Sequence, residues 1–304
     1  MLELNVNDET SPLKAVLLGT AKSNGPVPDP DDAYDPKSRE HILAGTYPEE
    51  EDMITEMDTV VKIFDRYGVD VYRPEVIENC NQIFARDIAF VIEDKLIKSN
   101  ILPRRDQEIN AINGLIRQID QKKVINLPAG AHVEGGDVIL NNDYIFIGCY
   151  TGKDYSHYIT ARTNVYAVEA IRKLFPDKKV KSFELVKSNT NAHENALHLD
   201  CCFQPVGENK AIICKDGFLH EKEYLWLVNY YGKQNIFEIT KEEMYQMFSN
   251  IFSIAPQVVI SDKHFKRLND WLKQQGIIVE EVSFTEIGKQ GGLLRCSTMP
   301  LVRV

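Results

Sequence analysis

The chain has 304 residues, of which 43% are hydrophobic and 26% charged, which is typical of a globular protein with a substantial core. Its formal net charge of −10 and its lack of lysine- or arginine-rich runs argue against nucleic acid or an anionic membrane as a partner. We expect no signal peptide and no membrane span, because no basic segment leads into an apolar one and no long apolar run occurs. The six cysteines form no CxxC pair, which is typical of a reduced, cytoplasmic protein.

The hydrophobic pattern predicts four consecutive units, each with the order strand, turn, strand, helix, strand. The second unit includes a helix predicted over residues 158–174, and the third opens with a strand predicted over residues 196–203. That strand would carry His198 and Asp200 on one face, because alternate residues of a strand point the same way. The four units cover, in chain order, residues 87–127, 138–186, 196–239 and 251–279.

A fifth unit is split between the two ends of the chain. Its first strand would be residues 296–302, its second residues 13–18 and its third residues 69–72. Its helix places four apolar residues at helical spacing, namely Ile54, Met57, Val61 and Phe64. Pairing the two ends would close a ring and leave no open sheet edge. The sequence therefore predicts a single domain, residues 1–304, built as a five-fold pseudosymmetric α/β propeller of ββαβ units around a central channel.

Residues 20–48 fall outside this pattern. They are rich in proline, aspartate and glycine and show no clear periodicity. A run of that length inside a compact domain is usually a functional loop or a disordered one. Two interpretations remain open for this segment: a lid over a central site, or a solvated excursion on the surface.

Polar motifs interrupt the apolar segments at the points where units begin, and ionisable groups in such places are costly unless they have a partner or a function. First strands of a five-unit ring would line its channel, so these side chains would converge although they are far apart in sequence. The motifs are Phe84-Ala-Arg-Asp87, His132-Val-Glu-Gly-Gly-Asp137, His198-Leu-Asp200 and Gly291-Gly-Leu-Leu-Arg-Cys296.

These residue types suit chemistry on a guanidinium, which is planar and permanently charged and forms bidentate hydrogen bonds with carboxylates. Asp87 and Asp200 could hold the cation from different sides while the thiolate of Cys296 attacks its central carbon. His198 is the natural proton donor to the leaving amine and afterwards the base that activates water. Glu134 would orient and charge that imidazole, as the acidic member of a catalytic triad does.

Two other interpretations of these residues compete with a catalytic site: inert core residues and a metal site. A lone histidine or cysteine in an apolar segment is more often an inert core residue, and only the joint occurrence of these groups at matching points of a repeat favours function. A metal site is the main chemical alternative, since five of the residues are ligand types: His132, Glu134, His198, Asp200 and Cys296. The HxE and HxD spacings lack the compact second pair of a structural zinc site, so we expect no metal and no cofactor.

The four motifs resemble those of the guanidino-group modifying superfamily, the pentein fold, which includes arginine deiminases, dimethylarginine dimethylaminohydrolases and glycine amidinotransferases. The resemblance implies a nucleophilic Cys296, an acid/base His198 and its partner Glu134. The segment Ala161-Arg-Thr-Asn164 is similar to one in dimethylargininases whose arginine contacts the α-carboxylate of the substrate. The resemblance therefore implies this contact for Arg162, with Arg104 or Arg105 as a second one. The implied substrate-binding residues are Phe84, Asp87, Arg104, Arg162 and Asp200.

The expected activity is hydrolysis of a guanidino compound, such as arginine or a modified arginine, to a ureido product through a covalent amidino-thioether. A transferase that passes the amidino group to an amine would share that intermediate and remains the alternative. A non-catalytic ring protein is the rival from another class, because the fold also occurs in a ribosomal anti-association factor. Such a protein should have lost the thiol, imidazole and carboxylates. The expected partner is a small cationic substrate, with a homodimer as a family-level expectation.

Overall fold

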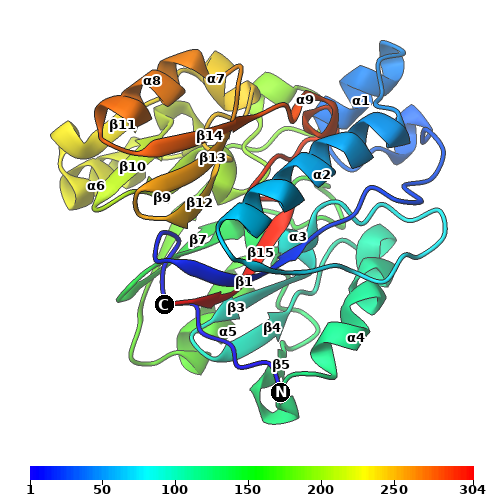
Figure 1. Ribbon diagram of the computed structural model, residues 1–304, viewed down its shortest axis with the longest axis horizontal. Helices are drawn as coiled ribbons and strands as arrows, with labels where there is room; N and C mark the ends of the chain where they lie inside the picture. The colour runs from blue at the N-terminus through cyan, green and yellow to red at the C-terminus, as the bar shows by residue number, and fades with distance from the viewer.

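The computed structural model describes residues 1–304 and contains five small sheets of three strands each, arranged around a common centre (Figure 1). The predicted five-fold pseudosymmetric α/β propeller is confirmed. In every sheet the middle strand pairs antiparallel with the first strand and parallel with the third. Given from first strand to third, the sheets are β3 (Ala89–Ile92), β4 (Lys95–Lys98) and β5 (Val124–Asn126); β6 (Val138–Asn141), β7 (Tyr144–Cys149) and β8 (Lys179–Glu184); β9 (Phe203–Val206), β10 (Lys210–Ile213) and β11 (Ile236–Glu238); β12 (Phe252–Ala255), β13 (Val258–Asp262) and β14 (Ile278–Val282); and β15 (Thr298–Arg303), β1 (Leu13–Leu18) and β2 (Asp70–Tyr72).

The fifth sheet joins the two ends of the chain. Strand β15 pairs antiparallel with β1, from Leu18 opposite Thr298 to Leu13 opposite Arg303. In Figure 1 the red C-terminal strand therefore lies beside the blue N-terminal strand. This pairing gives β1 a neighbour on each side and joins the two ends of the chain in one sheet. The five sheets stay separate, with each first strand at an edge, so the expectation that no sheet edge stays open is wrong.

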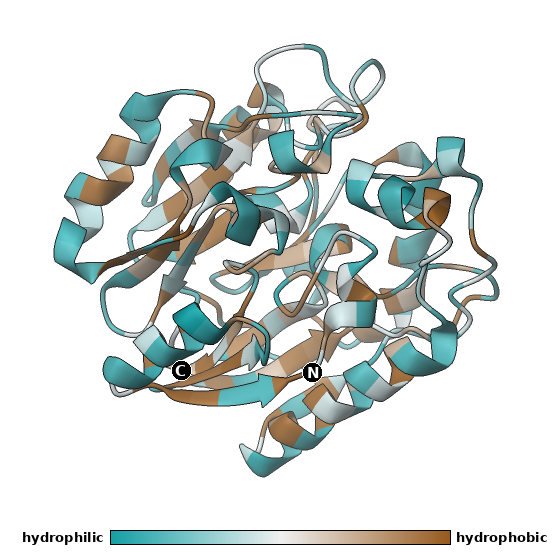
Figure 2. Ribbon diagram, turned by 90° about the horizontal axis from the view of Figure 1, so that it is seen from above, coloured by the Kyte–Doolittle hydropathy of each residue, from teal (hydrophilic) through white to brown (hydrophobic).

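Helices lie between the middle and third strands of the units and cover the outside of the ring. Figure 2 shows them with alternating hydrophobic and hydrophilic segments, as expected for helices with one face on a core. None combines the length and the apolar character needed to cross a membrane. The helices of the units are α2 (Glu50–Arg66), α4 (Asn113–Ile116), α5 (Val165–Leu174), α6 (Glu221–Tyr231) and α8 (Lys266–Gln274), and the shorter ones are α1 (Pro36–Leu43), α3 (Ala85–Ile88), α7 (Lys241–Tyr245) and α9 (Thr285–Gly288).

The strand predicted from residue 296 begins at Thr298, and two other predicted elements differ more from the structure. Helix α5 begins at Val165 rather than at residue 158, because the side chain of Asn164 accepts a hydrogen bond from the backbone N–H of Ala167 and caps the helix there. The strand predicted over residues 196–203 does not form before Phe203. The backbone N–H of Leu199 instead donates a hydrogen bond to the carboxylate of Asp137, at 2.9 Å. This N–H is therefore not available for hydrogen bonding to a neighbouring strand.

Aromatic packing between units contributes to ring stability. The ring of Phe64 on α2 is fully buried and meets that of Phe252 on β12 edge to face, with centroids 5.8 Å apart. We expect Phe64→Ala to lower the free energy of unfolding by about 3–5 kcal/mol, because a large cavity would open between two units. The matched change Tyr166→Ala, at a 54% exposed aromatic side chain, should cost about 0.5 kcal/mol or less. Urea denaturation of both variants tests this, and equal losses would contradict it.

Candidate active site

The predicted catalytic residues and the two aspartates lie on short turns before the first strands of the units, whereas Arg104 and Arg162 follow the middle strands β4 and β7. Asp87 is in α3, which leads into β3, and Glu134 precedes a 3₁₀ turn, Gly135–Asp137, that leads into β6. His198 precedes a 3₁₀ turn, Leu199–Cys201, that contains Asp200 and leads toward β9. The prediction that His198 and Asp200 share one face of a strand is therefore wrong. Their positions follow from a turn that directs the chain inward before the sheet begins.

A cavity of about 320 Å³ lies where these turns meet. Glu134 and Asp200 are fully buried and lie behind its wall, in contact with His198 and Cys296 respectively. The structure thus brings together groups that are more than two hundred positions apart in the sequence. The predicted site residues that line the cavity are Phe84, Asp87, Arg104, Arg162, His198 and Cys296.

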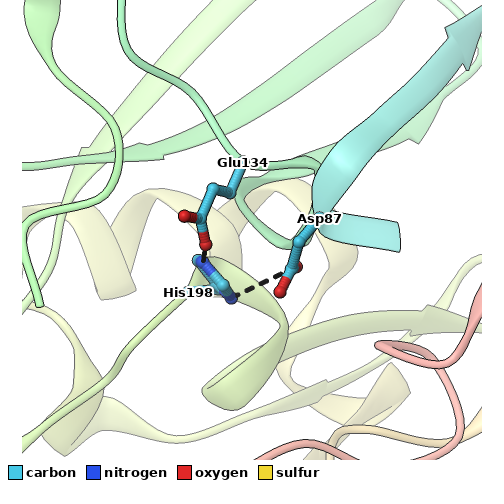
Figure 3. Close-up of side chains that lie close together, drawn as sticks. All are labelled: Asp87, Glu134 and His198. Atoms are coloured by element: carbon cyan, nitrogen blue, oxygen red, sulfur yellow. Dashed lines mark hydrogen bonds and ion pairs between the residues drawn. The ribbon is translucent and has the colours of Figure 1, made fainter. Parts of the chain in front are cut away.

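The imidazole of His198 lies between two carboxylates (Figure 3). Its Nε2 atom is 2.9 Å from Oε2 of Glu134, and its Nδ1 atom is 3.8 Å from Oδ1 of Asp87. Burial alone would lower the pKa of His198, but Asp87 and Glu134 outweigh it and raise that pKa to about 9. The imidazole is therefore a charged proton donor at neutral pH. Gly136 makes this placement possible, since a Cβ there would lie 2.6 Å from Nδ1 of His198.

Glu134 owes its charge to arginines on its other side. The Nη1 atom of Arg162 lies 3.0 and 2.9 Å from the two carboxylate oxygens of Glu134, and Nη1 of Arg105 lies 3.4 Å from one of them. Burial would raise the pKa of Glu134, but Arg162, the hydrogen bond to His198 and Arg105 hold it well below its usual range. Glu134 consequently stays ionised and can keep the imidazole charged.

Asp87 keeps one oxygen without a hydrogen-bond partner. Its Oδ2 accepts from Nη1 of Arg105 at 3.0 Å, whereas its buried Oδ1 has no partner. Arg105 itself is held by Glu108 through two hydrogen bonds of 2.8 and 2.9 Å. Burial raises the pKa of Asp87 despite the nearby charges of His198 and Arg105. An unsatisfied buried acceptor at a cavity wall is a place where a ligand N–H group would be stabilised.

Asp200 is held by an arginine for which the sequence predicted no role. Nη1 of Arg295 donates to Oδ2 of Asp200 at 2.9 Å, and its Nη2 donates to Oε1 of Glu9 at 2.9 Å. Burial raises the pKa of Glu9, but Arg295 and Arg86 lower it to about 2 overall. Glu9 carries no local signal in the sequence, because it lies in a polar N-terminal segment outside every predicted unit.

The thiol of Cys296 is 3% exposed and lies against a carboxylate and an amide. Its Sγ atom is 3.7 Å from Oδ2 of Asp200 and 3.2 Å from Nδ2 of Asn250. Burial, followed by the charges of Asp200 and Asp87, raises the pKa of Cys296 well above its ordinary value. The resting thiol therefore keeps its proton. A cation bound between these carboxylates would offset their charge and favour the thiolate.

The two neighbouring arginine candidates differ in position. Arg104 is 54% exposed at the rim of the cavity and pairs with Asp32 at 2.9 Å. Arg105 is buried and contacts the carboxylates of Asp87 and Glu134. Arg105 is thus the member of the pair that belongs to the buried network.

Phe84 lies over Gly292, where a Cβ would come within 2.3 Å of its ring, so this glycine allows the ring to approach the wall.

Residues 20–48 form the outer wall of the cavity. They supply ten of its 26 lining residues, including Tyr34 and Asp35. The backbone carbonyl of Tyr34 accepts a hydrogen bond from Nη2 of Arg162, and Asp35 caps α1 by accepting from the backbone N–H groups of Lys37 and Ser38. The segment therefore contacts the arginine that holds Glu134, rather than extending away from the site.

A metal is a poor match for this arrangement. One oxygen of Asp87, one of Glu134 and one ring nitrogen of His198 lie within 4.8 Å of one another. The same two carboxylates already face Arg105 and Arg162, whose guanidinium groups supply the positive charge that a metal would bring. His132, a member of the alternative ligand set, lies elsewhere and faces Asp154 at 3.1 Å.

A ring of five ββαβ units around a thiol, an imidazolium and paired carboxylates defines the pentein class of guanidino-group modifying proteins. Residues 32–303 match the family described as eukaryotic N,N dimethylarginine dimethylhydrolase, and the chain belongs to this family.

Two relatives found by sequence similarity are each 28% identical to this chain. An uncharacterized protein, YkgA of Bacillus subtilis (strain 168), is 28% identical over 225 residues, which are 73% of this chain and 70% of that protein. An arginine deiminase of Pediococcus pentosaceus is 28% identical over 211 residues, which are 57% of this chain and 47% of the deiminase. The chain therefore spans about half the length of that enzyme.

Solved structures share the fold. The N-terminal domain of ArgZ, covalently bound to a reaction intermediate, superimposes with a TM-score of 0.79 at 16% identity over 95% of this chain and 98% of its own. SxtG, an amidinotransferase of Microseira wollei, superimposes with a TM-score of 0.74 at 17% identity over 99% of this chain and 97% of its own. At these identities the likeness establishes the architecture alone.

Gly136 provides a test of the imidazole's placement. Because a Cβ at this position would overlap the ring of His198, we expect Gly136→Ala to lower the free energy of unfolding by about 1–3 kcal/mol. Gly130→Ala is the matched control, since its Cβ would meet the ring of Tyr166 at an ordinary 3.4 Å. Thermal or urea unfolding of the two variants compares them. If Gly136→Ala were as stable as the control, the close approach of His198 would be wrong.

The charge on His198 can be tested by titration. We expect its ring protons to titrate near pH 9 in nuclear magnetic resonance spectra, and Asp87→Asn to lower that pKa by about 1 unit or more. The sign follows because a carboxylate favours the charged imidazole, so its removal favours the neutral form. Asp154→Asn, which removes a contact with His132 instead, should leave the titration unchanged. A pKa of His198 at its ordinary value in the unmodified chain would contradict the prediction.

Proposed function

We propose that the chain is a cysteine-dependent hydrolase that converts a guanidino compound, arginine or a modified arginine, to its ureido product. The observation that carries this proposal is one cavity lined by a buried thiol, a charged imidazole and a carboxylate oxygen without a hydrogen-bond partner. These are the groups needed to hold a planar cation, attack its central carbon and protonate the amine that leaves.

In the first step the cation binds with an N–H group donated to Oδ1 of Asp87, while the charge of Asp200 attracts it from behind the wall, and the thiol proton is lost to water. The thiolate of Cys296 forms a bond to the guanidinium carbon. The bond from that carbon to the leaving nitrogen breaks as His198 gives up a proton, which releases ammonia or an alkylamine. The product of this step is a cationic amidino-thioether on Cys296 and a neutral imidazole.

In the second step water forms a bond to the amidino carbon while the neutral His198 takes one of its protons. The bond between carbon and sulfur then breaks, which restores the thiolate and leaves the ureido carbonyl. The remaining proton of the attacking water passes to solvent as the carbonyl forms, where the amine released in the first step takes it up as an ammonium ion. Glu134 stabilises the imidazolium that forms again at this point, at 2.9 Å from Nε2.

The far end of an amino-acid substrate would carry a carboxylate. Arg162 suits it, because it lines the cavity and its Nη2 atom, which donates one N–H group to the carbonyl of Tyr34, has a second N–H group for a carboxylate. Arg105 or Arg104 would supply the second contact, since both line the cavity. This assignment follows the resemblance of the segment around Arg162 to that of dimethylargininases.

An amidinotransferase is the second candidate. It stays a candidate because SxtG, an amidinotransferase, has the same architecture over nearly the whole chain. The two activities share the first step and differ in whether water or an amine attacks the amidino-thioether. The family match to a dimethylhydrolase favours water.

Isotopically labelled water separates these possibilities. Arginine, methylated arginines and an arginine–glycine mixture are each incubated with the protein in ¹⁸O-water and analysed by mass spectrometry. We expect a ureido product that carries the heavy oxygen, and at least about a thousandfold loss of rate in Cys296→Ser. Ornithine together with a new guanidino acid, free of heavy oxygen, would instead show a transferase. No change in any guanidino compound would contradict the proposed substrate class.

A further inference from the structure

The fourth unit, for which the sequence showed no polar motif, also contributes a residue to the site. Asp87 lies two positions before β3, and Cys296 lies two positions before β15. Asn250 lies two positions before β12 and so occupies the same place in the fourth unit. The pseudosymmetry of the ring therefore directs Asn250 toward the channel, where its amide meets the sulfur of Cys296.

The orientation of this amide is fixed by its oxygen. The Oδ1 atom of Asn250 accepts hydrogen bonds from the backbone N–H groups of Leu293 and Cys296, both at 3.2 Å. A flipped amide would place its NH₂ group against these two donors, so the nitrogen has to be the end that faces sulfur. The Nδ2 atom is 3.2 Å from Sγ of Cys296, and the whole side chain of Asn250 is buried.

The backbone around Asn250 is also tied to the site. Oγ of the neighbouring Ser249 donates to the carbonyl of Asp200 at 2.7 Å, and the backbone carbonyl of Asn250 accepts from the N–H of Arg295 at 3.4 Å. The segment of Ser249 and Asn250 thus fixes the carboxylate of Asp200 and the thiol of Cys296 relative to each other. This rigidity keeps the amide nitrogen at the sulfur with little freedom to turn away.

The sulfur would otherwise be in an unfavourable place for a negative charge. It is buried beside Asp200, and Asp87 also faces the cavity. Thiolates need donors or positive charge nearby in such surroundings. A side-chain N–H directed at Sγ is a donor of that kind, and a hydrogen bond to a charged atom is roughly twice as strong as one between neutral groups.

We propose that Asn250 is a catalytic residue whose Nδ2–H group donates to Cys296 Sγ and stabilises the thiolate, both before attack and when sulfur leaves the amidino carbon. This rests on the proposed function for the covalent steps, while the donation to sulfur stands on geometry alone. The amide makes and breaks no covalent bond. The thiol proton goes to water, and Asn250 retains its own protons throughout.

Alkylation of the thiol tests the proposal without any guanidino substrate. Below the pKa of Cys296, the rate of its reaction with iodoacetamide is proportional to the thiolate fraction. Asn250→Asp keeps the oxygen that accepts from the backbone but replaces the donor by a second oxygen. We expect it to slow alkylation of Cys296 by at least about tenfold between pH 7 and 9, followed by peptide mass spectrometry.

Two further variants separate donation to sulfur from a purely structural role. Asn250→Leu has a similar volume and no donor, so it should also slow alkylation by about tenfold, and it replaces the aspartate variant if that one fails to fold. Ser261→Ala loses a buried hydrogen bond in the same unit, to Oδ1 of Asn269 at 2.7 Å, but no contact at the site, and should leave the alkylation rate unchanged. Circular dichroism and the unfolding midpoint establish that each variant is folded.

The outcomes distinguish this proposal from the proposed function. Folded Asn250→Asp or Asn250→Leu with an unchanged alkylation rate would overturn the role of Asn250, even if the unmodified chain hydrolyses arginine. Slowed alkylation in a chain that modifies no guanidino compound would support the donation to sulfur and overturn the substrate class. Slowed alkylation together with at least about a tenfold lower kcat/KM would support both.

Discussion

Everything in this site depends on pairing buried carboxylates with buried cations. A carboxylate without a partner in an apolar interior would take up a proton, and the chemistry described above needs ionised ones. Arg162 and Arg105 hold Glu134, Arg105 also holds Asp87, and Arg295 holds Asp200. Each carboxylate then keeps some capacity for a further cation. That remaining capacity allows His198 to be charged and, in the proposed function, a guanidinium to bind.

The ring explains why so many charges can be buried in one place. Each unit turns its chain inward just before its first strand, and five such turns surround one channel. The sheets and the outer helices bury the apolar residues, so the stability of the fold does not depend on the channel being apolar. Charged groups there can therefore be selected for chemistry, provided that each has a partner. Glu9 illustrates the consequence, since an N-terminal residue ends beside an arginine 286 positions away.

Local sequence patterns predict most of this architecture, but they do not predict many of the contacts in the site. Alternating apolar residues and short turns predicted the five sheets, including the pairing of residues 13–18 with the C-terminal strand. The apolar run from residue 196 to 203 also reads as a strand, but the N–H of Leu199 is donated to Asp137, 62 positions away. No local pattern contains such a contact. The neighbours Arg104 and Arg105 are likewise indistinguishable in sequence, and only their different burial assigns one of them to the network.

The wall formed by residues 20–48 bears on which second nucleophile enters the cavity. The proposed amidino-thioether is common to hydrolysis and transfer, so the groups around Cys296 would not discriminate between water and an amine. Discrimination has to come from what reaches the carbon after the first amine departs. The wall is held by the contact between Tyr34 and Arg162 and by a cap at Asp35, and neither contact involves the reacting atoms. A wall that stays closed during the covalent step would admit water and exclude a larger amine. The reaction type would then depend on this segment rather than on the catalytic groups.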